Sequence, residues 1–461
     1  MKHPYNPGYL LRLTLTGALG GFLFGYDTAV INGANQFLKA YFELDSVGEG
    51  LASSSAIIGC IPGALVAGFL SDRFGRKRIL LLAAALYAIS ALCSAIPRTF
   101  DQFLVARFVG GLGIGVSSMV CPIYIAEVAP GPWRGRLGSL FQLGIVTGIF
   151  VTLFVNARIQ AAGDEAWNIA SGWRWMLGAE LVPALMLAAM QLVVPESPRW
   201  LAAAGRESEA GAILEKVGGP THAASEMAAV REVLKQEEGR FIELFRGACR
   251  RPLLIAVMLM AFSQFSGINA IMYYSTNIFT GAGVGVKDAF TASVWIGLVN
   301  VAFTFVAIAF VDRLGRRALL LVGSAVQVVA LGAVGVMLLT GASGPALLAT
   351  ILLFIAAFAV ALGPIPWIVC SEIFPTRTRG RAMSVAAFTI WTACYLVAQT
   401  FPVLRDSAWI GPARTFWIYG FCSLAAFVFV FRSVPETKGR TLEEIETSWH
   451  RPPGPTRPDP A

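Results

Sequence analysis

The chain has 461 residues, of which 56% are hydrophobic and only 14% are charged. A soluble domain carries about 25% charged residues, so this composition, with a mean hydropathy of +0.65, indicates a polytopic membrane protein. The formal net charge is +8, but the basic residues fall in short loops and form no stripe, which argues against a nucleic-acid partner. The seven cysteines form no CxxC pair and no metal-ligand spacing, so we expect neither disulfides nor a metal site.

Twelve apolar segments follow one another along the chain. Each is about 20 residues long, which is enough to cross ~30 Å of hydrocarbon. They predict transmembrane helices at 10–31, 51–71, 78–97, 102–122, 137–157, 174–194, 252–274, 290–311, 318–340, 347–370, 382–403 and 412–432. The sequence therefore predicts an all-α protein embedded in a lipid bilayer.

Basic residues are concentrated in alternate loops, after the second, fourth, eighth and tenth spans. These loops hold Arg73, Arg76, Lys77 and Arg78; Arg134 and Arg136; Arg313, Arg316 and Arg317; and Arg377, Arg379 and Arg381. The positive-inside rule predicts that the basic loops and both termini face the cytoplasm. This distribution fits a multi-pass protein of a bacterial inner membrane.

A long polar stretch divides the spans into two groups of six. It contains many acidic and basic residues among alanines, which predicts short amphipathic helices on the cytoplasmic face. The expected domains are an N-terminal half (1–194), this cytoplasmic linker (195–251), a C-terminal half (252–440) and a tail (441–461). The tail is rich in proline, and we expect it to be largely disordered.

Loop motifs of the first half recur in the second, roughly 240 residues further along, which predicts two homologous halves. Asp72–Lys77 matches Asp312–Arg317, Glu127–Pro130 with Arg134–Arg136 matches Glu372–Pro375 with Arg379–Arg381, and Pro195–Arg199 is echoed by Pro435–Arg440.

These duplicated loops predict a cytoplasmic gate. We expect Glu127 to pair with Arg134, and Glu372 with Arg379, between helices at that face. Asp72 and Asp312 are expected to accept hydrogen bonds from a helix N-terminus, which favours negative charge. They share their motifs with Arg76 and Arg316. Pairs that form only while this face is closed would be a gate; the alternative is a purely static contribution to topology and stability.

An unusually polar stretch, Ser263–Tyr274, lies inside the seventh span. Amides in hydrocarbon are costly unless they face a polar cavity or a partner. In a regular helix the spacing of Gln264 and Asn269 puts them on different faces. If both line one site, the helix must be broken near Gly267. A transporter has such a polar site near the bilayer midplane on a discontinuous helix.

The order of the motifs carries a resemblance to a known family. They are Gly20–Asp27, Asp72–Arg76, Arg107–Gly111, Pro195–Arg199, Gln264–Tyr274, Asp312–Arg316, Gly363–Trp367 and Pro435–Gly439. Along nearly its whole length the chain resembles the sugar porter family of the major facilitator superfamily. Within it, Ala157-Arg158, Gly172-Trp173-Arg174 and Trp409 are similar to the bacterial xylose–proton symporters.

The resemblance implies a major facilitator fold with two pseudo-symmetric six-helix halves, and a monomer. It also implies a sugar site, whose positions are Gln142, Gln264, Asn269, Tyr273, Asn300 and Trp367, with Phe24 and Trp391 as aromatic walls. Asn and Gln both donate and accept, as sugar hydroxyls do, and aromatic rings cover the C–H faces of a sugar. The alternative for a lone amide in a span is a hydrogen bond between helices.

Three positions depart from the family pattern. Ser263 stands where the family often has a glutamine, Ile390 where many relatives have Gln or Asn, and Ile149 where the xylose symporters have a second glutamine. The pocket has therefore lost hydrogen-bonding side chains, which argues against assigning xylose in particular.

Asp27 lies in the middle of the first span, and the resemblance pairs it with Arg107. The hypothesis is that Asp27 takes a proton from outside when this pair loosens and releases it when Arg107 approaches again. Glu180, a second carboxyl within a span, would tune this cycle. The alternative is a permanent buried ion pair that only fixes helix packing.

The expected function is import of a hexose or pentose with a proton by alternating access, with no cofactor and no Na⁺ cage. A passive sugar facilitator of the same fold is the main alternative. A drug or metabolite exporter and a sugar sensor fit less well, because the seventh span carries sugar-site motifs and the tail is short. No nucleophile–base pair or nucleotide loop indicates an enzyme.

Overall fold

The computed structural model describes residues 5–234, 241–245, 249–342, 344–374, 376–439 and 444, and all of its elements there are helices. They are α1 (Pro7–Tyr41), α2 (Ser46–Phe74), α3 (Arg76–Ala95), α4 (Phe100–Val128), η1 (Gly131–Trp133), α5 (Arg134–Gln160), α6 (Glu165–Trp167), η2 (Asn168–Gly172), α7 (Trp173–Gly178), α8 (Leu181–Val193), α9 (Pro198–Ala203), α10 (Glu207–Leu234), η3 (Phe241–Phe245), α11 (Arg250–Phe265), α12 (Ile268–Gly281), α13 (Val286–Leu314), α14 (Arg316–Thr340), α15 (Pro345–Val360), α16 (Ile365–Ile373), α17 (Thr376–Asp406) and α18 (Gly411–Ser433).

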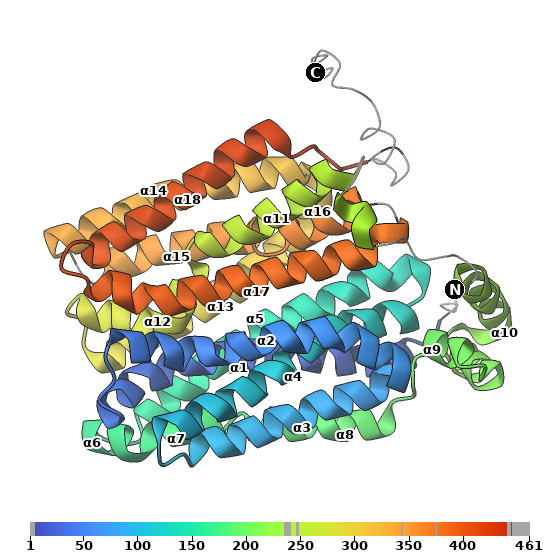
Figure 1. The fold of residues 1–461 in the computed structure, drawn as a ribbon, viewed down its shortest axis with the longest axis horizontal. Helices are drawn as coiled ribbons and strands as arrows, with labels where there is room; N and C mark the ends of the chain where they lie inside the picture. The colour runs from blue at the N-terminus through green and yellow to red at the C-terminus, as the bar shows by residue number, and fades with distance from the viewer. Residues whose placement is uncertain are drawn as a thin grey trace.

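The long helices run side by side in one bundle (Figure 1). In the described part of the chain, eleven helical segments are long and apolar enough to cross a membrane. The twelfth long helix of the bundle is α1, which has 35 residues and packs against α4 and α5. The prediction of an all-α bundle of twelve spans is confirmed.

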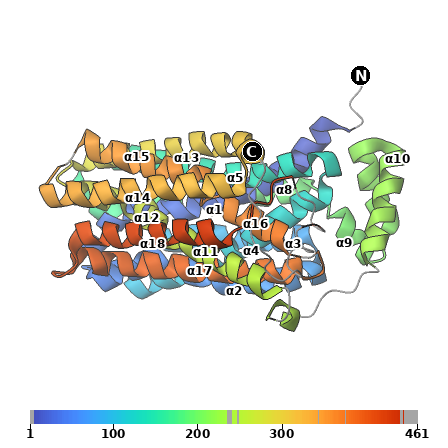
Figure 2. The same ribbon diagram turned by 90° about the horizontal axis from the view of Figure 1, so that it is seen from above.

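The bundle has two halves. The first half, α1–α8, lies below the second half, α11–α18, in the view of Figure 1. They meet along three helix pairs: α2 with α17, α5 with α13, and α1 with α12. Figure 2 shows the same arrangement from above. The surface between the halves is therefore where a site shared by both can form.

Three spans are interrupted. The sixth consists of α6, η2, α7 and α8; the seventh is α11 and α12; the tenth is α15 and α16. The seventh breaks where predicted, because Gly267 adopts the left-handed conformation with φ +84°. Only glycine takes this conformation without strain. Gln264 thus lies in the last turn of α11 and Asn269 in the first turn of α12.

The turns between α2 and α3 and between α13 and α14 are nearly identical. Gly75 (φ +95°) and Gly315 (φ +88°) are the single residues between the helices. A Cβ atom at Gly75 would collide with Glu196, and one at Gly315 with Glu436. We call the end of the bundle that holds these turns the basic-loop end, and the opposite end the far end.

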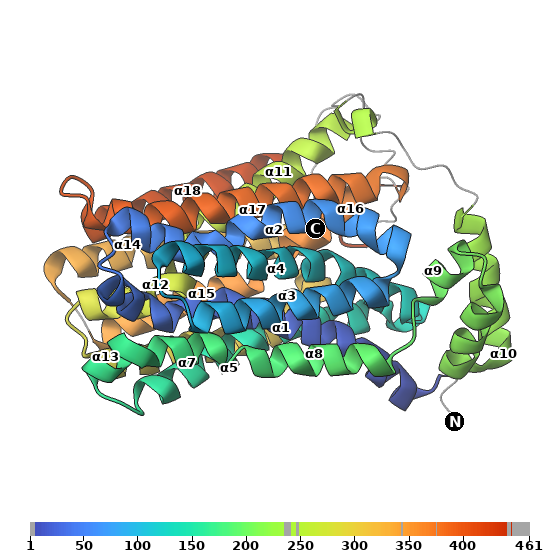
Figure 3. The same ribbon diagram turned by 60° about the horizontal axis from the view of Figure 1, so that its bottom comes forward.

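The linker helices α9 and α10 lie beyond the basic-loop end of the bundle, at the right of Figure 3. The helix α10 is interrupted by the non-helical residues Gly218 and Gly219. The start of the chain joins them, since Asn6 N–H donates to the carbonyl of Val217 at 2.8 Å. Arg231 donates to Glu207 at 2.5 Å, and this hydrogen bond lowers the pKa of that exposed carboxyl. The tail, apart from Glu444, lies outside the described residues.

Candidate functional site

The break at Gly267 brings the two amides of the seventh span together. Asn269 Nδ2 donates to Gln264 Oε1 and lies 3.0 Å from the Sγ atom of Cys394 on α17. The hydroxyl of Tyr273 lies 3.6 Å from the same sulfur. The side chains of Gln264 and Tyr273 are buried. Residues that a regular helix would separate therefore form one polar cluster between α11, α12 and α17.

Sequence reasoning missed Cys394. One signal could have found it: it follows Trp391, a predicted wall residue, by one helical turn, so both lie on the same face of α17. Ser263, the first departure from the family pattern, donates to the carbonyl of Leu362 at 2.9 Å. Its hydroxyl therefore ties α11 to the interruption between α15 and α16.

Aromatic rings from both halves meet beside this cluster. Phe24 of α1 lies 5.5 Å from Trp391 of α17, centroid to centroid, with the rings tilted by 45°. Phe141 of α5 lies 6.4 Å from Phe24. The predicted wall of Phe24 and Trp391 is thus a contact across the interface of the halves.

The remaining predicted sugar ligands come from other helices: Gln142 from α5, Asn300 from α13 and Trp367 from α16. Asn300 is 7% exposed and Gln142 and Trp367 are half-buried. The contacts of the described residues do not join them to the Gln264 cluster. Their membership of one site stays a prediction.

The predicted coupling pair is in contact. Arg107 donates from one guanidinium nitrogen to Asp27 Oδ1 and from another to the Asp27 carbonyl at 3.1 Å. Asp27 is fully buried, and Arg107 is 2% exposed. Among the described residues, Asp27 Oδ2 and Arg107 Nε have no hydrogen-bond partner. The pair therefore has one acceptor and one donor atom whose hydrogen-bonding capacity is unused.

Glu180 lies at the interruption between α7 and α8 and is 1% exposed. In the part of the chain that the structure describes, neither of its carboxylate oxygens has a hydrogen-bond partner. It is within electrostatic range of Asp27 and Arg107. An ionised carboxyl that is buried without a hydrogen-bond partner is costly, and a role for Glu180 in proton coupling stays a prediction.

The coupling pair and the polar cluster are neighbours. A space of about 10 Å³ is lined by Arg107 together with Tyr273 and Trp391. That is close to the volume one water needs. Arg107 of the predicted coupling pair and Tyr273 of the polar cluster therefore border the same small space.

At the basic-loop end, each half holds the same cluster. Arg76 donates twice to Glu127 at 2.9 Å, and Ser197 donates to Glu127 at 2.6 Å. The second half repeats this: Arg316 donates to Glu372 at 2.9 Å and Thr437 to Glu372 at 2.6 Å. The loop repeat in the sequence thus corresponds to a repeated ion-pair geometry.

In this structure Glu127 is bound by Arg76, and Arg134, its expected partner, is exposed. Arg379 donates to the Phe374 carbonyl at 3.3 Å. That Glu127 and Arg134, and Glu372 and Arg379, form a gate stays a prediction.

The expected acceptors at the helix N-termini need a correction. Asp72 and Asp312 pair with the side chains of Arg76 and Arg316 at 3.0 Å. The backbone N–H groups of those two arginines donate instead to Glu196, at 2.9 Å, and to Glu436, at 3.0 Å. The acceptors are the carboxylates that approach the glycine turns most closely.

Comparison with known proteins places the chain in a family. The family model described as "Sugar (and other) transporter" matches residues 13–449. The arabinose-proton symporter of Bacillus subtilis is 42% identical over 449 residues, covering 96% of each chain. The D-xylose-proton symporter of Escherichia coli K12 is 37% identical, covering 97% of each.

Comparison with solved structures gives the same family relationship. The inward open conformation of the E. coli xylose transporter superimposes with a TM-score of 0.86 at 36% identity, over 95% of this chain and all of that one. The same proton:xylose symporter bound to 6-bromo-6-deoxy-D-glucose gives a TM-score of 0.82 at 37% identity, over 96% of this chain and 100% of that one. The chain belongs to the sugar transporter family and has the major facilitator fold.

Proposed function

We propose that this protein is a proton-coupled monosaccharide importer that works by alternating access. The observation that carries the proposal is the placing of a buried Asp27–Arg107 pair beside a polar and aromatic cluster at the interface of the halves. Relatives named as arabinose-proton and D-xylose-proton symporters support the same activity.

The sugar would bind at Gln264, Asn269 and Tyr273, with Phe24 and Trp391 covering its C–H faces. Gln142, Asn300 and Trp367 would complete the site. The contact of Asn269 with Gln264 occupies amide groups that a sugar hydroxyl can use instead, since an amide both donates and accepts. Substrate binding would therefore exchange internal hydrogen bonds for hydrogen bonds to the sugar.

The proton would bind at Asp27. Protonation removes the carboxylate charge and so weakens its attraction to Arg107, while the approach of Arg107 favours release of the proton. Glu180 supplies a second carboxyl near the same guanidinium and would tune the exchange. Because Asp27 is on α1 and Arg107 on α4, loosening the pair frees α1, which also carries Phe24.

We further propose that the protein is a monomer in a bacterial inner membrane with the basic-loop end in the cytoplasm. The alternating distribution of Lys and Arg supports this orientation. The first described residues lie at the same end, beside α10, which is what a cytoplasmic N-terminus requires.

The test is uptake of labelled glucose, xylose, arabinose and galactose into liposomes that carry the purified protein, with and without an inward proton gradient. We expect gradient-dependent accumulation above the outside concentration. In Asp27→Asn, accumulation should be lost while sugar exchange persists. Gradient-independent equilibration in both proteins would overturn symport in favour of a passive facilitator and leave Asp27 a structural partner of Arg107.

A further inference from the structure

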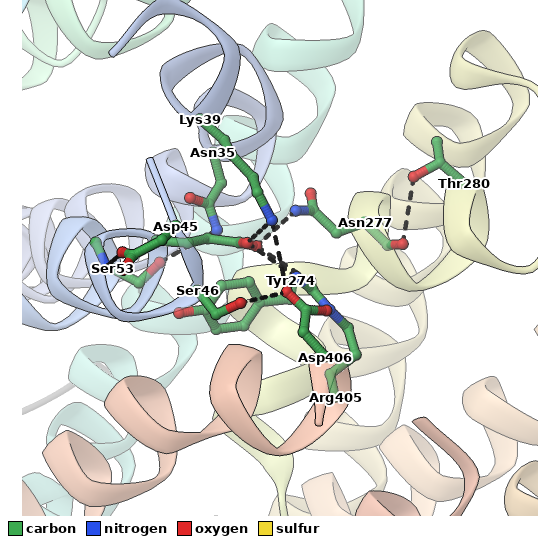
Figure 4. A network of polar contacts seen from close by, with 12 residues as sticks. Asn35, Lys39, Asp45, Ser46, Ser53, Tyr274, Asn277, Thr280, Arg405 and Asp406 are labelled. Atoms are coloured by element: carbon green, nitrogen blue, oxygen red, sulfur yellow. Dashed lines mark hydrogen bonds and ion pairs between the residues drawn. The ribbon is translucent and has the colours of Figure 1, made fainter. Parts of the chain in front are cut away.

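A charged cluster joins the two halves at the far end. Its centre is Glu49 on α2, whose side chain is fully buried. Lys39 of α1 donates to it at 2.8 Å, Asn277 of α12 at 2.9 Å, and Arg405 of α17 at 3.1 and 2.9 Å. Figure 4 shows these side chains converging from three helices. A carboxylate of the first half is thus held largely by the second half.

A second carboxylate mirrors this arrangement. Asp406 of the second half is bound by Arg405 beside it, at 2.7 and 3.0 Å. It also accepts a hydrogen bond from Ser46 at 2.6 Å and lies 3.6 Å from Lys39, both in the first half. Each half therefore contributes one anion and one cation, and each anion has partners on both sides of the interface.

The short helix α12 is fixed to α1 next to this cluster. Asn32 donates to the carbonyl of Met272 and to the hydroxyl of Ser275, both at 2.7 Å. Thr276 donates to the Asn32 carbonyl at 2.8 Å. Since α12 begins at the break that builds the polar cluster, closure of the far end and the geometry of the sugar site are mechanically linked.

We infer that Lys39, Glu49, Arg405 and Asp406 form a reversible charge latch that holds the far end closed in one state of the transport cycle and opens in the other. The inference rests on the proposed alternating access. We call these four residues the far-end latch.

The charges explain why the far-end latch can open. When the halves separate, Glu49 keeps Lys39 within the first half and Asp406 keeps Arg405 within the second. Each carboxylate therefore keeps a cationic partner. A buried charge left without one would be strongly destabilising. A cavity of about 560 Å³ borders Lys39, Asn277, Arg405 and Asp406, so water can hydrate the charges as the pairs part.

The basic-loop end differs. There, the pairs Arg76–Glu127 and Arg316–Glu372 each join helices of a single half. They can persist whichever end of the protein is open. The far-end latch, in contrast, has ion pairs that must break when α17 moves away from α1 and α2.

The direct test is a distance measurement between the halves at the far end. Spin labels are placed on Val47→Cys and Ala408→Cys, both exposed, after the partly or fully exposed Cys93, Cys249 and Cys422 are replaced by serine. Pulsed electron–electron double resonance on the protein in lipid nanodiscs then gives the distribution of distances between the two spin labels. We expect Arg405→Gln and Glu49→Gln to raise the long-distance population several-fold, and Arg405→Lys to restore much of the short one.

Arg158→Gln is the matched control, because Arg158 is an exposed arginine at the same end outside the latch; it should leave the distribution unchanged. An unchanged distribution in both Arg405→Gln and Glu49→Gln would overturn the inference. So would loss of the folded protein in both, because that is the behaviour of a permanent cross-link.

Transport measured in parallel separates this inference from the proposed function. In Arg405→Gln we expect kcat for gradient-driven uptake to fall several-fold, with a smaller change in KM, because the far-end latch does not touch the sugar. The distances require neither sugar nor proton gradient. If wild-type protein fails to accumulate sugar but the distances shift as expected, symport is wrong and the far-end latch stands.

Discussion

The backbone of Gly267 decides the shape of the polar cluster. With φ at +84°, a Cβ atom there would also lie 2.5 Å from a ring carbon of Tyr419. Both strain and steric overlap would push α12 away from its place. The cluster of Gln264, Asn269 and Tyr273 depends on that place, because these residues lie on opposite sides of the break.

We therefore expect Gly267→Ala to lower sugar uptake at least tenfold and to destabilise the fold by about 1–3 kcal/mol, the usual cost of such backbone strain. Uptake assays and thermal melting of the purified protein check this. Gly281→Ala is the control, since a Cβ atom at Gly281 meets no atom within 4 Å. Wild-type uptake in Gly267→Ala would show that the break is tolerant of a side chain.

Cys394 is the one residue of α17 whose side chain contacts both Asn269 and Tyr273 in the described structure. Removing its sulfur in Cys394→Ala would leave the Asn269 amide less well oriented. One hydrogen bond contributes about 0.5–1.5 kcal/mol. If the free energy of sugar binding weakens by this amount, the KM for sugar rises roughly 2- to 10-fold. Cys394→Ser should stay near wild type, because its hydroxyl can take over both contacts. Initial rates of uptake over a range of sugar concentrations measure the difference, and an equal KM in the two variants contradicts the assigned contact.

At the scale of elements, Glu196 and Glu436 perform the same task in each half. Each accepts hydrogen bonds from two successive N–H groups, of Arg76 and Lys77 in one case and of Arg316 and Arg317 in the other. A carboxylate at a helix N-terminus is favoured by the exposed N–H groups and by the helix dipole.

We expect Glu196→Ala and Glu436→Ala to destabilise the protein to a similar degree, by about 0.5–2 kcal/mol, the range for loss of a side-chain cap. Thermal melting in one detergent is the measurement. Glu215→Ala, an exposed position on α10, should melt as wild type does. A large effect in only one half would contradict the equivalence of the two turns.

The sequence predicts elements better than it predicts their partners. Span positions follow from hydropathy, and the break in α11–α12 follows from a glycine between two amides that need one site. The partner of Glu127 does not follow, because Arg76 and Arg134 lie in different loops and only the fold decides which one reaches it. Likewise Lys39, Glu49 and Arg405 are single charges near the ends of three different helices. Glu49 and Arg405 lie 356 positions apart in the sequence, and no local pattern joins them.

At the scale of the whole molecule, the two ends are built differently. The ion pairs at the basic-loop end each lie within one half, while the far-end latch spans the interface. The proposed alternating access therefore predicts that the contacts between the halves at the far end break during the cycle, while those within each half at the basic-loop end persist.

The orientation of this bundle in the membrane gives the last prediction. If the basic-loop end is cytoplasmic, Ala408→Cys at the far end faces the outside and Ser208→Cys on α10 faces the inside. Both positions are exposed, so reactivity depends on the side of the membrane alone.

The variants are expressed in bacterial cells in the background in which Cys93, Cys249 and Cys422 are serine, and intact cells are treated with a membrane-impermeant maleimide. We expect most of the Ala408→Cys protein to be labelled and Ser208→Cys to react only after the cells are permeabilised. The reverse pattern would place the basic loops outside, against the electrostatic preference for positive loops in the cytoplasm, and would overturn the proposed orientation.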